Sequence, residues 1–121
     1  KAQFARDMAA AEASNDTSAI AHLKLAYATR ELERKKAMFD AGVIPDSEYD
    51  QVRYARDLAA AELSRNRVEI TSVTLAYAER VLQRAELRYK AGIVTASELD
   101  KARFERERAA IRVKSDSVKR R

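Results

Sequence analysis

Apolar side chains recur every seven residues along most of this chain. The series begins at Phe4, and Ser18 is its one polar member. A second apolar stripe, which includes Leu63, Ile70 and Tyr77, runs beside the first. A sustained seven-residue period is typical of helices that pack as in a coiled coil, and two adjacent stripes indicate a helix with two neighbours. The positions of the first stripe are 4, 11, 18, 25, 32 and 39, then 54, 61, 68, 75, 82 and 89, and finally 104, 111 and 118.

Glycine and proline mark where these helices end. Gly42 and Gly92 each follow a long helical pattern and suit the left-handed residue that terminates many helices. Pro45 lies just beyond the first of them and cannot continue a helix interior. The sequence therefore predicts an all-α fold in which long antiparallel helices form a coiled-coil-like, up-down-up bundle. The predicted helices span residues 2–40, 47–90 and 97–119.

Two polar segments leave the continuity of the first two helices open. Residues 14–18 and 64–72 are poor in helix-forming side chains. If the helices break there, the two glycine loops fall on the same side; if they run through, the loops lie at opposite ends of a long bundle. Neither segment contains glycine or proline, and Val68 and Ile70 continue the stripes. We therefore expect continuous helices.

The chain also repeats itself with a period of 50 residues. The run Leu25–Ala28 returns unchanged as Leu75–Ala78, and Ala41-Gly42 returns as Ala91-Gly92. Self-similarity at a fixed period indicates one supersecondary unit that is copied and packed against its neighbours. We read residues 1–121 as a single helical domain made of copies 1–50 and 51–100 and a partial copy, 101–121.

Composition narrows the possible chemistry. The 121 residues include no cysteine, 36% are charged, and the net charge is +5. Disulfides and thiolate metal sites are therefore excluded, and no apolar run is long enough to span a membrane. His22 is the single histidine, and its counterpart one repeat later is Ser72, so we interpret it as a surface or seam residue. We expect neither an enzyme nor a bound cofactor or metal.

Residues that follow each loop carry helix-start signals. We expect Asp46 or Ser47 to cap the second helix, and Thr95 or Ser97 to cap the third. Carboxylates in the next turn have two interpretations, a cation or acid–base site and simple compensation of the helix dipole, and capping accounts for them. These carboxylates are Asp46, Glu48, Asp50, Glu98 and Asp100.

Positive charge is concentrated at the end of the chain. Residues 101–121 hold nine lysines and arginines against three acids, whereas residues 1–100 are nearly neutral. A basic segment of this kind binds nucleic acid or an anionic membrane surface, or it is a solvated helix end, where cations suit the helix dipole. The candidate basic patch is Arg103, Arg106, Arg112, Lys119, Arg120 and Arg121.

The two helix connections are unusually apolar. Residues 42–44 read Gly-Val-Ile, and residues 92–94 read Gly-Ile-Val. Loops in water are normally polar. The branched side chains either fold back to plug the bundle end or form an apolar tip that docks on another protein. The candidate tip residues are Gly42, Val43, Ile44, Gly92, Ile93 and Val94.

These loops resemble the hairpin tips of two families of export proteins. Residues 88–103, Arg-Tyr-Lys-Ala-Gly-Ile-Val-Thr-Ala-Ser-Glu-Leu-Asp-Lys-Ala-Arg, resemble the tip of TolC-type outer-membrane efflux proteins. Residues 39–51, Phe-Asp-Ala-Gly-Val-Ile-Pro-Asp-Ser-Glu-Tyr-Asp-Gln, are similar to the tip of periplasmic membrane-fusion (adaptor) proteins. The resemblance implies a periplasmic or cell-envelope location and tip-to-tip docking.

Together these observations predict a structural, protein–protein interaction module. The resemblance narrows it to a periplasmic helical hairpin segment of an export or efflux assembly, with protein partners, further copies of itself, or both. The alternative is a basic helical module that binds nucleic acid or an anionic membrane surface through residues 101–121.

Overall fold

The computed structural model describes residues 2–13 and 16–119, and it is all-helical over these residues. Arg120 and Arg121 of the predicted basic patch lie outside the described residues. Within them there are five helices and no strand. The helices are α1 (Ala2–Ala13), α2 (Thr17–Asp40), α3 (Asp46–Ser64), α4 (Arg67–Lys90) and α5 (Ala96–Lys119).

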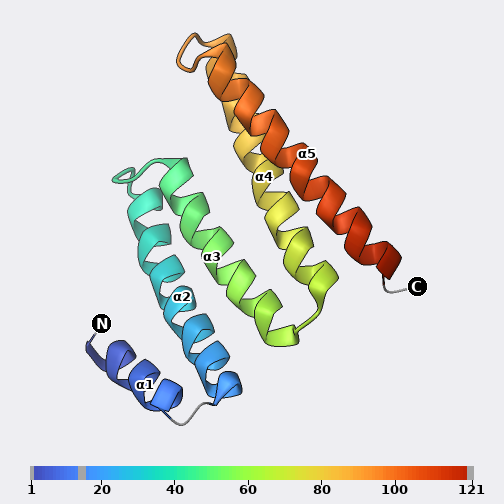
Figure 1. The fold of residues 1–121 in the computed structure, drawn as a ribbon. Helices are drawn as coiled ribbons and strands as arrows, with labels where there is room; N and C mark the ends of the chain where they lie inside the picture. The colour runs from blue at the N-terminus through green and yellow to red at the C-terminus, as the bar shows by residue number, and fades with distance from the viewer. Residues whose placement is uncertain (1, 14–15, 120–121) are drawn as a thin grey trace. The chain divides into compact units, whose positions relative to one another are not determined.

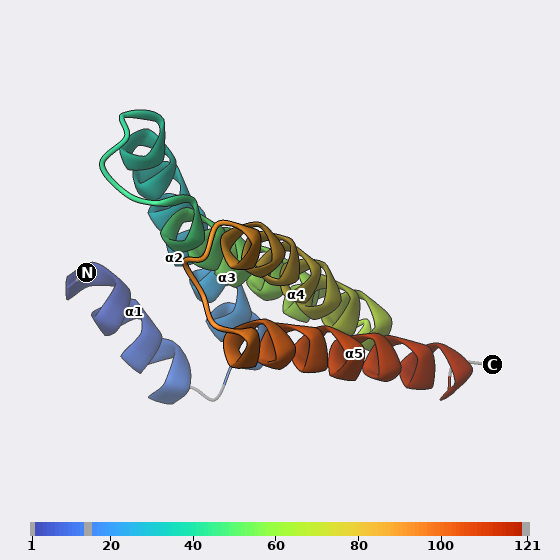
Figure 2. The same ribbon diagram turned by 90° about the horizontal axis from the view of Figure 1, so that it is seen from above.

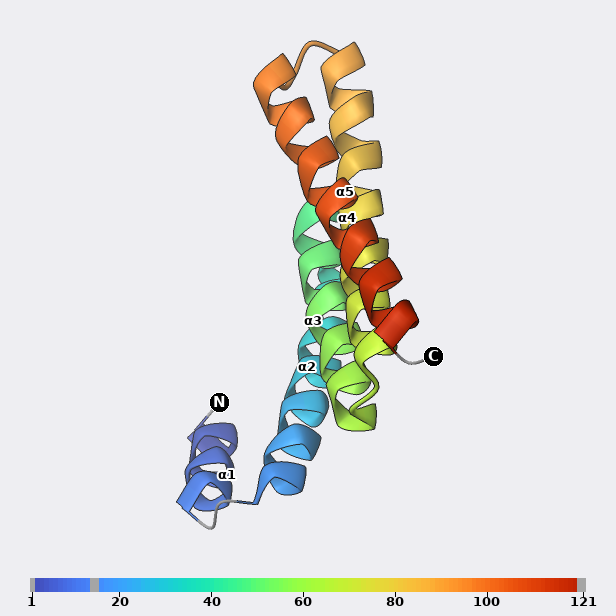
Figure 3. The same cartoon turned by 45° about the vertical axis from the view of Figure 1, so that its right-hand side comes forward.

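The helices fall into two compact units. The first contains α1, α2 and α3; α2 packs against both α3 and the shorter α1 (Figure 1). The second contains α4 and α5, which pack against each other as a helical hairpin (Figures 2 and 3). In each unit a glycine loop joins an antiparallel pair of helices: α2 with α3, and α4 with α5.

The prediction of continuous helices over 2–40 and 47–90 is wrong. α1 ends at Ala13 and α3 ends at Ser64, and the residues that precede α2 and α4, Asp16 and Asn66, have extended backbone. The Asp16 carboxylate accepts a hydrogen bond from the Ala19 amide at 3.0 Å. The Asn66 side chain accepts from the amides of Val68 and Glu69 at 3.0 and 3.3 Å. Each Asx side chain satisfies amides that would otherwise lack partners at a helix start, and such a cap stabilises the break by about 1 kcal/mol.

The second break also needs no glycine. Arg65 ends α3 in the left-handed region with φ of 58°, and among the described residues it is the one non-glycine residue with positive φ. An L-residue in this conformation costs about 1–2 kcal/mol. Its amide donates to the Glu62 carbonyl at 3.1 Å, and its guanidinium Nη2 lies 3.4 Å from Thr17 Oγ1 of α2. These contacts offset part of that strain.

Two helices start after the glycine loops, and the predicted cap is found at one of these starts. Thr95 precedes α5, and its hydroxyl accepts a hydrogen bond from the Glu98 amide at 3.1 Å, as predicted. The prediction of Asp46 or Ser47 as the cap of α3 is wrong. α3 already begins at Asp46, and the N-cap position is held by Pro45, whose ring offers no oxygen to the first amides.

The buried interior is narrow. Four of the five buried apolar residues are alanines: Ala11, Ala61, Ala102 and Ala109, with Leu99 as the fifth. Small side chains allow two helices to approach closely but bury little area, and each buried methylene group contributes only about 0.8 kcal/mol. Many larger apolar side chains therefore stay exposed on the surface.

The helix break at Asn66 can be tested by mutation, because a break and a continuous helix predict opposite effects of Asn66→Ala on stability. Asn66→Ala removes both side-chain hydrogen bonds at the start of α4, so we expect the free energy of unfolding to fall by about 1 kcal/mol. Urea denaturation followed by circular dichroism measures this. Asn66→Asp keeps an acceptor at the same position and should lose much less. In a continuous helix Asn66→Ala would instead be stabilising, because alanine is the better helix former.

Candidate interaction surfaces

The first glycine loop is a helix-terminating turn closed by two backbone hydrogen bonds. The Gly42 amide donates to the Phe39 carbonyl at 2.9 Å, and the Val43 amide donates to the Met38 carbonyl at 2.9 Å. This pair of bonds defines the Schellman motif, which requires a left-handed residue between them. Gly42 supplies it with φ of +74°.

The second loop, 50 residues later in the chain, has the same geometry. Gly92 has φ of +75°, and its amide donates to the Tyr89 carbonyl at 3.0 Å. The Ile93 amide donates to the Arg88 carbonyl at 2.8 Å. The residues before the glycines, Ala41 and Ala91, share φ of −83° and ψ near 0°. Both glycines therefore act as the predicted helix terminators.

Within each loop the two branched residues have different environments. Val43 is 67% exposed and Ile93 is 72% exposed, whereas Ile44 and Val94 are half-buried. The sequence predicts that these residues either plug the bundle end or form an apolar tip. The structure divides them: Ile44 and Val94 turn inward, while Val43 and Ile93 leave an apolar side chain in solvent at each tip.

The helix ends next to the two loops also expose large apolar side chains. Among the large apolar residues that stay exposed, most lie at the two helix ends beside the glycines. The sequence pattern does not single them out as site residues, although Phe39 and Tyr89 each end a stretch of the seven-residue series. We call these groups the hairpin tips. The first tip is Met38, Phe39 and Val43, and the second is Leu87, Tyr89 and Ile93.

Aromatic stacking orders the first tip. The rings of Phe39 on α2 and Tyr49 on α3 are stacked, with centroids 4.9 Å apart and planes 6° from parallel. Stacked rings of this kind contribute about 0.5–1.5 kcal/mol beyond the area they bury. In the second tip the equivalent pair is Tyr89 and Leu99, so one aromatic ring is replaced by an aliphatic side chain.

An ion pair crosses between the helices below the first tip. Lys35 Nζ of α2 donates to Glu48 Oε2 of α3 at 2.8 Å. This hydrogen bond, together with the carboxylate charge, raises the pKa of Lys35 above its usual value of 10.5. Lys36, one residue along, bonds Asp40 of its own helix at 3.0 Å, and that bond and charge raise its pKa in the same way.

The equivalent carboxylate in the second unit has a different partner. Ala85 stands where the first copy has Lys35, so no cation is available there for Glu98. Glu98 Oε1 instead lies 3.2 Å from the Thr95 hydroxyl and 3.5 Å from the Thr95 amide. With the Thr95–Glu98 amide bond this is a capping box. Glu98 therefore takes part in a helix cap, as the capping interpretation predicts, whereas Glu48 joins two helices.

The four described members of the predicted basic patch have different surroundings. Arg103 lies 3.4 Å from Asp100, and Arg106 lies 3.0 Å from Glu107, so two of its members have acidic neighbours. Arg112 and Lys119 border a groove of about 400 Å³ between the start of α4 and the end of α5. The same groove contains the ion pair of Arg67 and Asp116, 3.7 Å apart.

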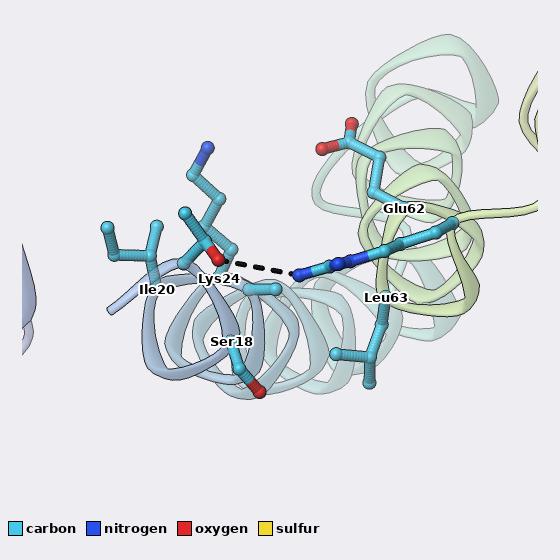
Figure 4. Close-up of a pocket in the computed structure, with 8 residues that line it drawn as sticks. Ser18, Ile20, Lys24, Glu62 and Leu63 are labelled. Carbon is cyan, nitrogen blue, oxygen red and sulfur yellow. Dashed lines mark hydrogen bonds between the residues drawn. The ribbon is translucent and has the colours of Figure 1, made fainter. Parts of the chain in front are cut away.

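A smaller groove of about 250 Å³ lies in the first unit, between the start of α2 and the end of α3 (Figure 4). The dashed line in the figure is the bond from Arg65 to Thr17 that closes one side of it. Lys24 and Glu62 extend from opposite helices at its rim, and Ile20 and Leu63 supply apolar surface. Its charges are opposed rather than of one sign, which makes it a poor site for a small charged ligand.

His22 takes part in a local contact only. Its Nδ1 lies 2.8 Å from the Ser18 carbonyl oxygen on the same helix, and the side chain is exposed.

Among the described residues, no group of three or more histidine, cysteine or acidic side chains is placed to hold a metal ion. No described helix combines the length and apolar character needed to cross a membrane.

Comparison with known proteins adds no relative: no protein-family model, no curated protein and no solved structure matches the chain.

Replacing the turn glycines tests how strongly they hold the loops. A Cβ built on Gly42 or Gly92 meets no atom within 4 Å, so substitution strains the backbone alone. We expect Gly42→Ala and Gly92→Ala each to lower the free energy of unfolding by about 1 kcal/mol. Gly42→Asn should cost less, because asparagine tolerates the left-handed region better. Equal losses for alanine and asparagine in urea denaturation would show that backbone conformation is not the cause.

The pKa of Lys35 provides a test of the ion pair that crosses between α2 and α3. Direct NMR titration of the lysine side chains should place the Lys35 pKa above 10.5, and Glu48→Gln should return it towards that value. Lys36 is the internal control, because its partner is Asp40 and its pKa should not move. Because folding raises the Lys35 pKa, the pair stabilises the fold below pH 10.5, and that contribution is lost as pH rises through the higher folded value. An unchanged Lys35 pKa in Glu48→Gln would contradict the pairing.

Proposed function

We propose that this chain is a structural protein–protein interaction module that docks on other proteins through its two hairpin tips. The observation that carries the proposal is the exposure of Val43 and Ile93 on Schellman turns closed by backbone hydrogen bonds, each beside further exposed apolar side chains. Apolar side chains that gather at one place on a surface commonly mark a docking site. A turn held by backbone hydrogen bonds presents them with little conformational entropy to lose on binding.

We further propose that each 50-residue copy is one helix–link–helix unit that ends in a glycine loop, and that the copies belong to an up-and-down bundle. Support comes from the matching bounds of α2 and α4, which are both 24 residues long and start 50 residues apart. The identical loop geometry at Gly42 and Gly92 adds to it. In this proposal the tip is the part of the unit on which function depends, and the helices position it.

The resemblance of residues 88–103 and 39–51 to export-protein tips suggests the partner class. We propose a TolC-type outer-membrane efflux protein or a periplasmic adaptor protein as the partner, with a periplasmic or cell-envelope location. Chains that meet through apolar tips would need few charged contacts. The alternative, binding of nucleic acid or anionic membrane through residues 101–121, has less support because Arg103 and Arg106 already lie beside carboxylates.

Tip docking can be tested with purified proteins. We expect the chain to bind a purified TolC-type channel or a purified adaptor protein in biolayer interferometry, and the double variant Val43→Asp/Ile93→Asp to lose that binding. Its melting temperature should barely change, because both side chains are largely exposed. Gly42→Ala is the matched control: it keeps every tip side chain, lowers stability by about 1 kcal/mol and should still bind.

Two results would overturn tip docking. One is binding that survives Val43→Asp/Ile93→Asp but is lost in Arg112→Glu/Lys119→Glu and weakens steeply with salt, as electrostatic binding does. The other is a large fall in melting temperature for the double variant, because burying a charge is costly and such a fall would mean that these side chains plug the hairpin ends.

A further inference from the structure

A second exposed apolar surface lies on α5, away from the hairpin tips. Phe104, Ile111 and Val118 are 62%, 65% and 65% exposed. They are spaced seven residues apart, and seven residues make nearly two full turns, so the three side chains form one line along the helix. We call this line the α5 row. Its length sets it apart from the scattered single apolar residues that are normal on protein surfaces.

The α5 row lies opposite the face that packs against α4. That packed face is made of Leu99, Ala102 and Ala109, all buried. Side chains two positions apart on a helix point about 200° away from each other. Phe104 therefore points away from Ala102, and Ile111 from Ala109. α5 is apolar on two opposite sides, and its own unit uses one of them.

The equivalent face of α1 packs against another helix. Phe4 and Ala11 occupy in the first copy the positions that Phe104 and Ile111 occupy in the third. Phe4 stacks on Tyr27 of α2, with ring centroids 4.3 Å apart, and Ala11 is buried. This face of the repeat therefore packs against another helix. On α5 the same positions carry an equally large and a larger side chain, which suits them to the same kind of contact.

Charges beside the α5 row select the kind of helix that fits. Glu107 and Lys114 flank it on the same side, one seven-residue step apart, and both are exposed. If α5 met a parallel copy of itself, each would face its own like charge. In an antiparallel pair centred on Ile111, Glu107 and Lys114 of the second copy lie on the same edge of the pair and within one residue of the same level, about 1.5 Å along the helices, so the two charges can meet. Phe104 then packs on Val118 of the second copy, so each position of the row has an apolar partner.

We propose that α5 pairs antiparallel with α5 of a second copy of this chain, about a two-fold axis at Ile111. The same surface serves both copies, so the assembly closes as a dimer and does not grow into a fibre. Three apolar side chains from one helix bury less than a standard interface, which places the expected dissociation constant in the micromolar range. The contact uses none of the tip residues, so it stands or falls independently of tip docking.

Sedimentation equilibrium of the full chain across micromolar concentrations tests the dimer. We expect Ile111→Glu to raise the dissociation constant about tenfold or more, because it places two carboxylates at the axis. Leu87→Glu is the matched control: Leu87 is 68% exposed on α4, close to the 65% of Ile111, and lies at the second tip. Circular dichroism verifies that both variants stay helical. A chain that is monomeric throughout, or a dimer lost in Leu87→Glu and kept in Ile111→Glu, would overturn the proposal.

Exchange of the flanking charges tests the direction of the pair. Glu107→Lys and Lys114→Glu alone should each weaken the dimer about threefold or more, since each turns two attractions into repulsions. The double variant Glu107→Lys/Lys114→Glu should restore it, because an antiparallel pair regains both attractions. A parallel pair would keep like charges together and would not be restored, so failure of the double variant contradicts the antiparallel arrangement.

A distance measurement gives an independent reading of direction. The chain contains no cysteine, so Lys101→Cys provides a single site for a nitroxide spin label. In the antiparallel dimer the two labelled positions lie on opposite sides of the axis, roughly 30 Å apart along the helices at 1.5 Å per residue. In a parallel dimer they would lie roughly 10 Å apart, which is the usual distance between packed helices. Pulsed electron paramagnetic resonance that finds the short distance would overturn the proposal.

Discussion

A left-handed glycine at the end of a helix is the constraint on which both hairpins depend. Gly42 and Gly92 hold φ near +75°, a conformation that other L-residues adopt only at a cost. This single dihedral angle lets two backbone bonds close the turn and returns the chain alongside the helix it has just left. It also decides which side chain is exposed. The residue after each glycine, Val43 or Ile93, stays in solvent, while the next one, Ile44 or Val94, is half-buried.

The all-helical fold and the two loops could be predicted from the sequence because their signals are local and strong. Glycine at the end of a long apolar period has few other interpretations, and both glycines end helices as expected. The breaks before α2 and α4 could not be predicted with the same security. An Asx cap stabilises a break by about 1 kcal/mol, and the left-handed Arg65 costs a similar amount. Because these opposing terms nearly cancel, contacts such as Arg65 with Thr17 contribute to the outcome, and no sequence pattern shows them.

The sequence shows which segments form the candidate sites, but it does not show how the individual side chains in those segments are placed. An apolar loop was evident, whereas its division into inward and outward residues follows from the Schellman turn. The partners of Glu48 and Glu98 depend on position 35 or 85, which lies on the neighbouring helix and has no local link to the carboxylate. Lysine there draws Glu48 across to α2, and alanine leaves Glu98 to bond Thr95. Charge counting over residues 101–121 likewise missed the pairing of Arg103 and Arg106 with nearby acids.

Polar residues recur at positions 16, 66 and 116, and the different role of the last one decides how far the α5 row extends. Asp16 and Asn66 cap new helices, whereas Asp116, at the equivalent position, lies inside α5. Its side chain is only 12% exposed and lies 3.7 Å from Arg67 Nε of α4 instead of binding backbone amides as a cap. Because α5 continues through this point, Val118 falls in line with Phe104 and Ile111. A break there would leave two apolar positions in the row, too few to define an axis with matching partners on either side. The ion pair of Arg67 and Asp116 therefore connects the packing of the second unit to the surface that we assign to dimerisation.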